Sequence, residues 1–407
     1  MRARKEPGIV SGVSILISNP LGANLTRGKL LPLHGLPDVR TLVVVQDAAG
    51  PALSNVQYLT LGPSPLANTL PRVGRLLHVA RRVMAMCVGI IRHRPWLVMG
   101  IYMMPHGLLA YVLGALTGRR VCIHVIGGPR EIIDGGYWMD QWQVRRPSTF
   151  LEAVYLRVLR RTDIIVVVGT ETKRYLASRG VPPDRIHVIS SKIDAKRFRP
   201  APARHDYDLI LAAQLIKRKR VDLFLRIVAD LAVRRPSVRA AILGDGPLRD
   251  DLARLAGSLG IADRVDFVGF HEDTEAYYNR AKVFVLTSSA EGLSLAMMEA
   301  MACGLPVVVP AVGDLADVVR PGETGYLVDD DDREAFVAAI QRLLEDDQLR
   351  RALGWNARST ILRGYTVEDG SRLWRAALEK AIPSLQQIAP LDPAATLHTR
   401  DVTGPER

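Results

Sequence analysis

The chain has 407 residues, of which 48% are hydrophobic and 24% charged, a balance that excludes an intrinsically disordered protein. This length exceeds what one hydrophobic core usually organises, so it predicts two domains. The net charge of +12 is concentrated in residues 1–202, which hold 28 Lys or Arg against 11 Asp or Glu. A basic first half favours an anionic partner, but no nucleic-acid-binding motif is present, so we expect no nucleic acid.

The start of the chain is basic, but the apolar segment that follows is short and interrupted by Ser, which indicates a first strand rather than a signal peptide. The three cysteines, Cys87, Cys122 and Cys303, lie in apolar surroundings without metal-binding spacing. They are typical of buried thiols in a reducing compartment. Both observations predict a cytoplasmic protein.

Apolar runs of five to eight residues alternate with helix-length amphipathic segments along the chain. This alternation predicts βαβ units and parallel sheets. The expected strands are Val13–Ser18, Val39–Gln46, Trp96–Met103, Arg120–Ile126, Ile164–Val168, His187–Ile189, Leu209–Ala213, Arg239–Gly244, Val265–Gly269, Val283–Thr287, Val307–Pro310 and Gly325–Val328.

A proline-rich segment at 200–202 is typical of a linker. We therefore predict an α/β fold in which two Rossmann-like, doubly wound domains face a cleft at the carboxyl ends of their strands. The domains are expected over residues 1–200 and 201–368. A helix over 369–382 and a disordered tail over 383–407 complete the chain.

Residues 95–118 carry no charge and so meet the length rule for a membrane-spanning helix. A Pro-His-Gly sequence at 105–107 interrupts this stretch in the middle. We therefore favour a buried strand over 96–103 and a helix over 108–116 that packs on it.

The segment VFVLTSSAEGLSLAMMEAMACGLPVVVP, residues 283–310, predicts a strand, a loop, a helix and a second strand. Ser294 has the position of a helix N-cap, and Gly304 has that of the residue that ends the helix. The first turn therefore presents free N–H groups that suit a phosphate. Glu291 precedes this turn, and Glu299 lies about 7.5 Å along the helix from Ser294 at 1.5 Å per residue.

Two carboxylates on either side of a diphosphate could each bind a vicinal diol, one on a sugar and one on a ribose. A nucleotide-diphosphate sugar has this order of groups. The structural alternative is that Glu291 gains only helix-dipole stabilisation and that Glu299 pairs with an arginine.

The segment EGLSLAMMEAMACGLPVVVPAVGDLADVVRPGETGYLV resembles the donor-binding region of the retaining GT-B glycosyltransferases marked by an E-x7-E motif, group 1 and family 4 in type. The resemblance is strong over residues 160–380 and weak over 10–160. It implies that Glu291 contacts the donor sugar near the reacting carbon and that Glu299 binds the ribose. The residues expected to hold the donor at the helix start are Gly292, Leu293, Ser294 and Leu295.

The segment LILAAQLIKRKRVDLF lies where this family has the pattern G-R-L-x-x-x-K-G. Lys219 stands at the lysine, and the resemblance implies that it neutralises the leaving diphosphate. Gln214 stands where the family has Arg, and Arg220 replaces the Gly. One positive charge is therefore missing, and Lys217 and Arg218 are candidates to supply it.

The resemblance also implies that the backbone near Gly269 and Phe270 faces the nucleobase. The family usually has His-Gly at the end of a strand of the first domain, where this chain has Ile126 and Gly127. His124 lies two residues earlier, on the same face of the strand, and is a candidate to replace the missing group. The alternative is a satisfied histidine of the core.

We therefore predict a retaining hexosyltransferase that moves a sugar from a nucleotide-diphosphate sugar to a lipid-linked or saccharide acceptor bound by the first domain. No cofactor or metal is expected, because Lys219 and the helix end would stabilise the leaving group and the acidic run at 329–332 is typical of a capping turn. Open alternatives are another GT-B enzyme, such as a sugar-nucleotide epimerase or a phosphorylase, and a non-catalytic relative that binds a sugar nucleotide.

The basic segments at 75–94 and 157–161 form either a solvated face or a surface for an anionic membrane. A lipid-linked acceptor favours the second interpretation. It predicts peripheral attachment to the inner face of the cell membrane and a role in polysaccharide or glycolipid synthesis.

Overall fold

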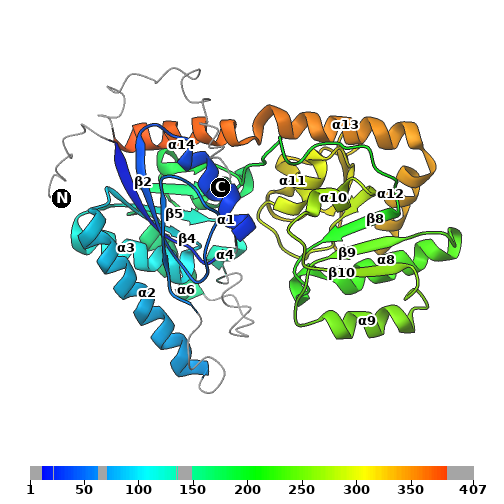
Figure 1. Cartoon of the computed structure of the whole chain (residues 1–407), viewed down its shortest axis with the longest axis horizontal. Helices are drawn as coiled ribbons and strands as arrows, with labels where there is room; N and C mark the ends of the chain where they lie inside the picture. The colour runs from blue at the N-terminus through cyan, green and yellow to red at the C-terminus, as the bar shows by residue number, and fades with distance from the viewer. Residues whose placement is uncertain (1–11, 22, 63–70, 134, 136–148, 383–407) are drawn as a thin grey trace, which may run out of the picture.

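The computed structural model describes residues 12–21, 23–62, 71–133, 135 and 149–382. Over these residues the chain forms two α/β domains that lie side by side (Figure 1). The expected tail at 383–407 lies outside the described part of the chain.

The N-terminal domain is built on a parallel sheet whose described strands number seven, in the order β3-β2-β1-β4-β5-β6-β7. The strands are β1 Val13–Ser18, β2 Val39–Gln46, β3 Val56–Thr60, β4 Leu97–Ile101, β5 Arg120–Val125, β6 Ile164–Val167 and β7 Ile186–Val188. The helices are α1 Ala23–His34, α2 Pro71–His93, α3 Leu108–Thr117, α4 Arg130–Ile133, α6 Thr149–Leu159 and α7 Thr170–Ser178. This strand order, with β1 in the middle, is the Rossmann arrangement.

The C-terminal domain repeats this order in a parallel sheet of six described strands, β10-β9-β8-β11-β12-β13. The strands are β8 Tyr207–Ala212, β9 Ala240–Leu243, β10 Val265–Gly269, β11 Ala281–Val285, β12 Val307–Pro310 and β13 Gly325–Val328. The helices are α8 Val221–Arg234, α9 Arg249–Ser258, α10 Thr274–Tyr278, α11 Leu295–Ala302, α12 Arg333–Glu345 and α13 Asp347–Gly364. The predicted pair of doubly wound domains is confirmed.

Each sheet is buried on both faces, which is why its strands are continuous apolar runs. In β1, Ile15 and Ile17 pack into the cluster that contains the α1 side chains, whereas Leu16 packs with side chains of α2 and α3 on the other face. Successive strand residues point to opposite faces, so one short run supplies both cores.

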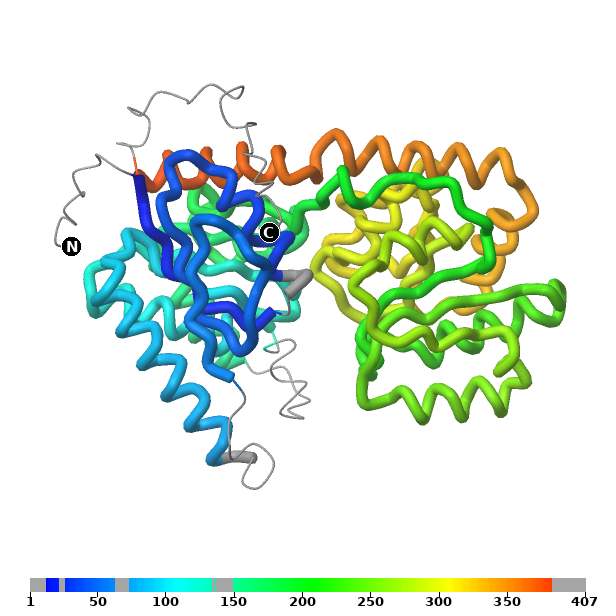
Figure 2. Tube along the Cα trace, viewed as in Figure 1, coloured from blue at the N-terminus to red at the C-terminus, as the bar shows by residue number. Residues whose placement is uncertain are grey.

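Helix α14, Val367–Ala381, follows α13 and crosses from the C-terminal to the N-terminal domain (Figure 2). It begins with a capping box formed by Thr366 and Asp369. Its Trp374 and Leu378 are buried in the same cluster as the side chains of α1. The last helix of the described chain therefore belongs to the core of the first domain.

Strand β3 was not expected, because it is an edge strand whose residues Val56–Thr60 are half-buried or exposed and lack a clear apolar run. Residues 95–118 do form a strand and a helix, β4 and α3, with a turn of π-helix over Met103–Gly107 between them. Within the described residues, no helix combines the length and the apolar character needed to cross a membrane.

Candidate active site

A cavity of about 580 Å³ lies between the two domains. The C-terminal domain lines this cavity with residues at the carboxyl ends of strands β8, β9 and β10. Ligands bind at this edge of the sheet in open α/β proteins. The C-terminal lining residues used below are Gln214, Phe270, Tyr278, Leu295 and Glu299. From the N-terminal side the polar lining residues are Arg27, Lys192, Asp194 and Arg197.

Helix α11 begins at this cavity. The hydroxyl of Ser294 accepts a hydrogen bond from the backbone N–H of Met297 at 3.3 Å, so Ser294 is the predicted N-cap. Leu295, in the first turn, lines the cavity. Gly304 follows the helix with a φ of 87°, a conformation that favours glycine. The helix therefore presents its positive end beside the cavity.

Glu299 lines the cavity from the second turn of α11. Its Oε2 accepts a hydrogen bond from the Tyr278 hydroxyl at 3.2 Å. Burial raises the pKa of Glu299 to about 7, while the Tyr278 hydrogen bond and the charge of Arg197 act in the opposite direction. A carboxylate with one hydroxyl donor already in place retains acceptor capacity for further hydroxyl groups.

Glu291 forms an ion pair and hydrogen bond with Lys219, and both side chains are largely buried. Burial raises the pKa of Glu291, but the charge of Lys219 and the hydrogen bond that Lys219 donates act in the opposite direction, and the net pKa is lowered. Glu291 is therefore ionised at neutral pH. This ion pair connects Glu291, which the resemblance assigns to the donor sugar, with Lys219, which it assigns to the leaving diphosphate.

The loop after β11 holds Lys219 in place. The Thr287 hydroxyl donates to the carbonyl oxygens of Lys219 and Arg220 at 3.0 and 2.9 Å, and the backbone N–H of Ser289 donates to Arg218 at 2.9 Å. Arg220 has a φ of 46°, in the left-handed region, which explains why the related pattern has Gly there. Its side chain pairs with Asp331 at 2.8 Å.

The peptide between Glu291 and Gly292 is tightly enclosed. A Cβ on Gly292 would lie 1.9 Å from the carbonyl oxygen of Ile126, and one on Gly128 would lie 2.8 Å from that of Glu291. A Cβ on Gly313 would lie 1.9 Å from the Glu291 oxygen as well. Gly128 and Gly313 also have positive φ angles. These glycines let the loop after β5 of the first domain contact the residue beside the candidate sugar site.

The other residues predicted to bind the donor differ in whether they line the cavity. Gln214 is exposed and lines the cavity. Phe270 also lines it with 68% of its surface exposed, after Gly269, whose φ is 88°. The cavity-lining residues do not include Gly269, Gly292, Leu293 and Ser294, nor the paired Glu291 and Lys219.

The structure does not bring His124 to the cavity. The side chain is 2% exposed and lies in the N-terminal core, with Nε2 3.2 Å from Nζ of Lys29 and the ring edge against Trp374. Burial, with the nearby Lys29, holds the pKa of His124 well below its ordinary value. The expectation that His124 replaces the family's histidine at the site is not supported, because β5 turns this side chain toward α14 rather than toward the second domain.

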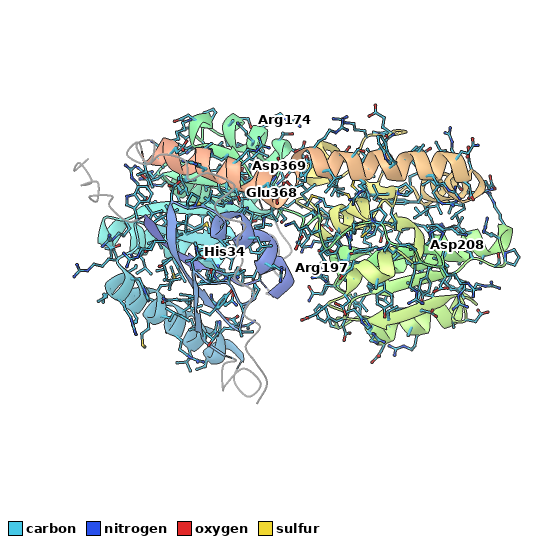
Figure 3. All side chains as sticks on the ribbon, turned by 45° about the horizontal axis from the view of Figure 1, so that its top comes forward. His34, Arg174, Arg197, Asp208, Glu368 and Asp369 are labelled. Atoms are coloured by element: carbon cyan, nitrogen blue, oxygen red, sulfur yellow. The ribbon has the colours of Figure 1, made fainter. Side chains whose placement is uncertain are left out.

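Sequence reasoning missed three cations that reach the cavity from the first domain, Arg27, Lys192 and Arg197. Arg197 lies between the domains in Figure 3 and pairs with Glu275 at 2.8 Å. Lys192 donates to the carbonyl oxygen of Gly364 at 3.0 Å, and burial lowers its pKa to about 8. The segment SSKIDAKRF contains the last two, but only the fold shows that they face the cavity.

Two Rossmann-like domains that enclose a cavity at their facing edges define the GT-B class of proteins. Residues 192–360 match the family model of the glycosyl transferases group 1, and residues 29–191 match that of the glycosyl transferase 4-like domain. The chain belongs to the group 1 glycosyltransferase family with the GT-B fold.

A GDP-mannose-dependent alpha-(1-6)-phosphatidylinositol monomannoside mannosyltransferase of Mycolicibacterium smegmatis is 31% identical over 238 residues, 53% of this chain and 62% of that protein. A lipopolysaccharide core biosynthesis glycosyltransferase of Rhizobium meliloti is 35% identical over 155 residues, 38% of this chain and 44% of that protein. The chain spans less than two thirds of the length of these curated relatives.

Among solved structures, the Anabaena protein HepE in complex with UDP and glucose is similar with a TM-score of 0.72 and 17% identity. The likeness covers 90% of this chain and 99% of that one. At this identity the likeness shows a common fold.

Proposed function

We propose that the chain is a retaining glycosyltransferase that moves a hexosyl group from a nucleotide-diphosphate sugar to a lipid-linked or saccharide acceptor. The observation that carries the proposal is the ion pair of Lys219 with Glu291 beside the N-terminus of α11, with Glu299 further along the same helix. A cation, free N–H groups and two carboxylates in this order match the charges and hydroxyl groups of such a donor.

In the proposed reaction, Lys219 and the N-terminus of α11 stabilise the negative charge that develops on the leaving diphosphate, without a metal ion. The ionised Glu291 accepts hydrogen bonds from hydroxyl groups of the donor sugar. Glu299 accepts those of the ribose. Phe270, an exposed aromatic ring at the cavity wall, offers a stacking surface for the nucleobase.

The comparisons support a sugar-nucleotide donor, since one relative is named as GDP-mannose-dependent and one neighbour was solved with UDP and glucose. Retention is supported by the E-x7-E resemblance and by the alpha-(1-6) linkage in that relative's name. The two relatives' names refer to a phosphatidylinositol mannoside and to the lipopolysaccharide core. These names support a role in glycolipid or polysaccharide synthesis, and we propose that the chain acts at the cytoplasmic face of a membrane with the acceptor on the N-terminal domain.

The test is a panel of UDP- and GDP-sugars measured by thermal shift, followed by NMR of the products with lipid-linked acceptors. A donor that binds the folded state raises the melting temperature. The proposal expects one donor to do so and its sugar to appear in an alpha-linked product from an alpha-configured donor. An isomerised nucleotide-sugar would indicate an epimerase instead, and an inverted product would exclude retention.

A further inference from the structure

The outward face of helix α2 is apolar along its length. Leu76, Met84 and Ile91 expose 69%, 65% and 76% of their surfaces. Val73, Leu77 and Val88 are exposed as well, and the spacing of three, four and seven residues places all six on one side of the helix. At 1.5 Å per residue this apolar stripe is about 27 Å long.

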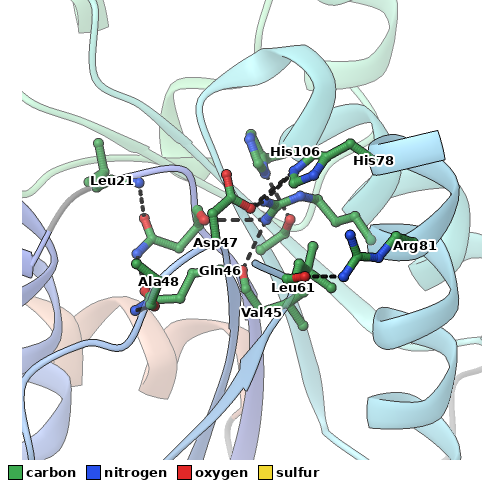
Figure 4. A network of polar contacts seen from close by, with 12 residues as sticks. Leu21, Val45, Gln46, Asp47, Ala48, Leu61, His78, Arg81 and His106 are labelled. Atoms are coloured by element: carbon green, nitrogen blue, oxygen red, sulfur yellow. Dashed lines mark hydrogen bonds and ion pairs between the residues drawn. The ribbon is translucent and has the colours of Figure 1, made fainter. Parts of the chain in front are cut away.

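The opposite face of α2 is fixed to the sheet, so the apolar stripe cannot simply turn inward. Arg82 is 2% exposed, donates to the carbonyl oxygens of Asn19 and Val45 at 3.2 and 3.0 Å, and pairs with Asp47. His78 lies 3.0 Å from the same carboxylate (Figure 4). These contacts attach α2 to the ends of β1 and β2.

Helix α3 continues this surface. Met86 and Ile90 of α2 share one buried cluster with Ala110 and Leu113 of α3, so the two helices cover the same face of the sheet. The outward side of α3 exposes Val112 and Leu116. We call the outward faces of α2 and α3 together the α2–α3 surface.

The sequence around this surface is basic, and Asp47, the carboxylate next to α2, is paired with Arg82 and His78. Residues 48–130 contain nine arginines and no Asp, Glu or Lys. Arg92 is exposed at the end of α2, and Arg94 is exposed directly after it. An apolar stripe that ends at two exposed arginines, in a sequence segment without a carboxylate, complements a layer of anionic headgroups over hydrocarbon.

We propose that the α2–α3 surface docks on an anionic lipid bilayer, with the apolar stripe in the interface and the arginines at the lipid phosphates. A protruding helix suits a planar bilayer, and α2 extends from the edge of its domain (Figure 1). This inference deepens the proposed function by naming the partner of the N-terminal domain. Lipid binding is measured without donor, so it can fail while glycosyl transfer stands.

The experiment is co-sedimentation of the full chain with vesicles of phosphatidylcholine alone or mixed with phosphatidylglycerol. We expect stronger binding to the mixed vesicles than to phosphatidylcholine alone, reduced but not abolished by high salt because the apolar contacts are not screened. The triple variant Leu76→Ser, Met84→Ser, Ile91→Ser should bind at least about tenfold more weakly. Its matched control is Val233→Ser with Trp355→Ser, two exposed apolar residues of the C-terminal domain, which should bind as wild type.

Unchanged circular dichroism verifies that the triple variant folds. A second variant, Met84→Trp, should show a blue shift of fluorescence with anionic vesicles. Absent binding by wild type, equal binding to neutral vesicles, or undiminished binding by the triple variant would each overturn the proposal. A dimer that dissociates in the triple variant and binds no vesicles would identify a second copy of the chain as the occupant and overturn it too.

Discussion

Asp314 of the C-terminal domain accepts two hydrogen bonds from Thr172 of the N-terminal domain, from the backbone N–H at 3.1 Å and from the hydroxyl at 2.6 Å. Asp317 accepts the backbone N–H of Thr170 in the same way, at 2.6 Å. Helix α7 starts at Thr170, and its own N-cap, Gly169, offers no side chain. Carboxylates of one domain therefore cap a helix of the other.

We predict that Asp314→Ala loosens the two domains. Losing a helix cap costs about 1 kcal/mol, so amide exchange at 170–172 should be about fivefold faster. Solution scattering should show a larger radius of gyration. Asp332→Ala is the control, because Asp332 caps α12 within one domain through the N–H of Ala335 at 2.9 Å. If both variants change the scattering equally, the interdomain bonds do not hold the domains together.

The two glutamates should differ in kinetics. Glu299→Ala is expected to weaken nucleoside diphosphate binding and raise KM, because ribose contacts contribute similarly to ground and transition states. Glu291→Ala should mainly lower kcat, because its partner group lies near the reacting carbon. Calorimetry with the free nucleoside diphosphate separates the two. Equal affinity of wild type and Glu299→Ala would contradict the ribose assignment.

Much of this site was predictable, because short-range patterns specify it. Ser294 and Gly304 mark the ends of α11, Glu299 lies on that helix, and Glu291 lies in the loop before it. The buried strands can be recognised in the sequence as apolar runs, whereas the half-exposed strand β3 cannot. Strand alternation predicts which face of the sheet His124 is on, but it does not predict what covers that face. In the structure the cover is Trp374 of α14, 250 residues later in the chain.

Long-range features could not be predicted from local patterns. Arg82 belongs to a helix whose sequence is basic and typical of a solvated face, yet its side chain is buried and donates to the backbone carbonyl oxygens of Asn19 and Val45. Arg27 and Arg197 reach the same cavity from opposite ends of one domain's sequence. The absence of acidic residues over 48–130 is visible in the sequence, but its meaning depends on which face of α2 is outward.

The raised pKa of Glu299 gives a stability prediction. Burial raises this pKa to about 7, above the value of about 4.3 in an unfolded chain. Between these pH values the native state holds a proton that the unfolded state releases, so the free energy of unfolding falls as pH rises. Glu299→Gln removes the titrating carboxyl group and, with it, this pH dependence of the free energy of unfolding. Its melting temperature relative to wild type should therefore rise by about 2–4 °C from pH 5 to pH 8. A constant difference across that range would contradict the raised pKa.

Lys219→Ala should lower turnover by about 10²-fold, the scale of losing one preorganised group at a developing charge. The position that related enzymes fill with Arg holds Gln214, so Lys219 has more of the diphosphate charge to neutralise. Gln214→Arg should partly restore turnover in the Lys219→Ala background. Lys217→Ala, in the same turn but exposed, tests the rival candidate and should leave turnover near the wild-type value. Single-turnover rates with saturating donor measure the effect, and an unchanged Lys219→Ala rate would move the role to Lys217 or Arg218.

Glu131 should position the loop that contacts Glu291. The Glu131 carboxylate is 2% exposed and accepts backbone N–H groups of Met103 at 2.6 Å, Ile126 at 2.8 Å and Gly127 at 2.7 Å. That loop in turn packs its Ile126 carbonyl against Gly292. Glu131→Gln places an amide donor where the carboxylate accepted, so one or more backbone N–H groups lose their partner.

The loop should then shift beside the candidate sugar site but not beside the nucleotide cavity. We expect kcat to fall about tenfold or more while the affinity for nucleoside diphosphate stays constant. Glu152→Gln is the control, since Glu152 accepts the Tyr175 hydroxyl at 2.7 Å in the same domain. A general loss of stability would lower both variants alike. A Glu131→Gln enzyme with wild-type kcat, or one that loses nucleotide affinity as well, would show that this loop does not act through Glu291.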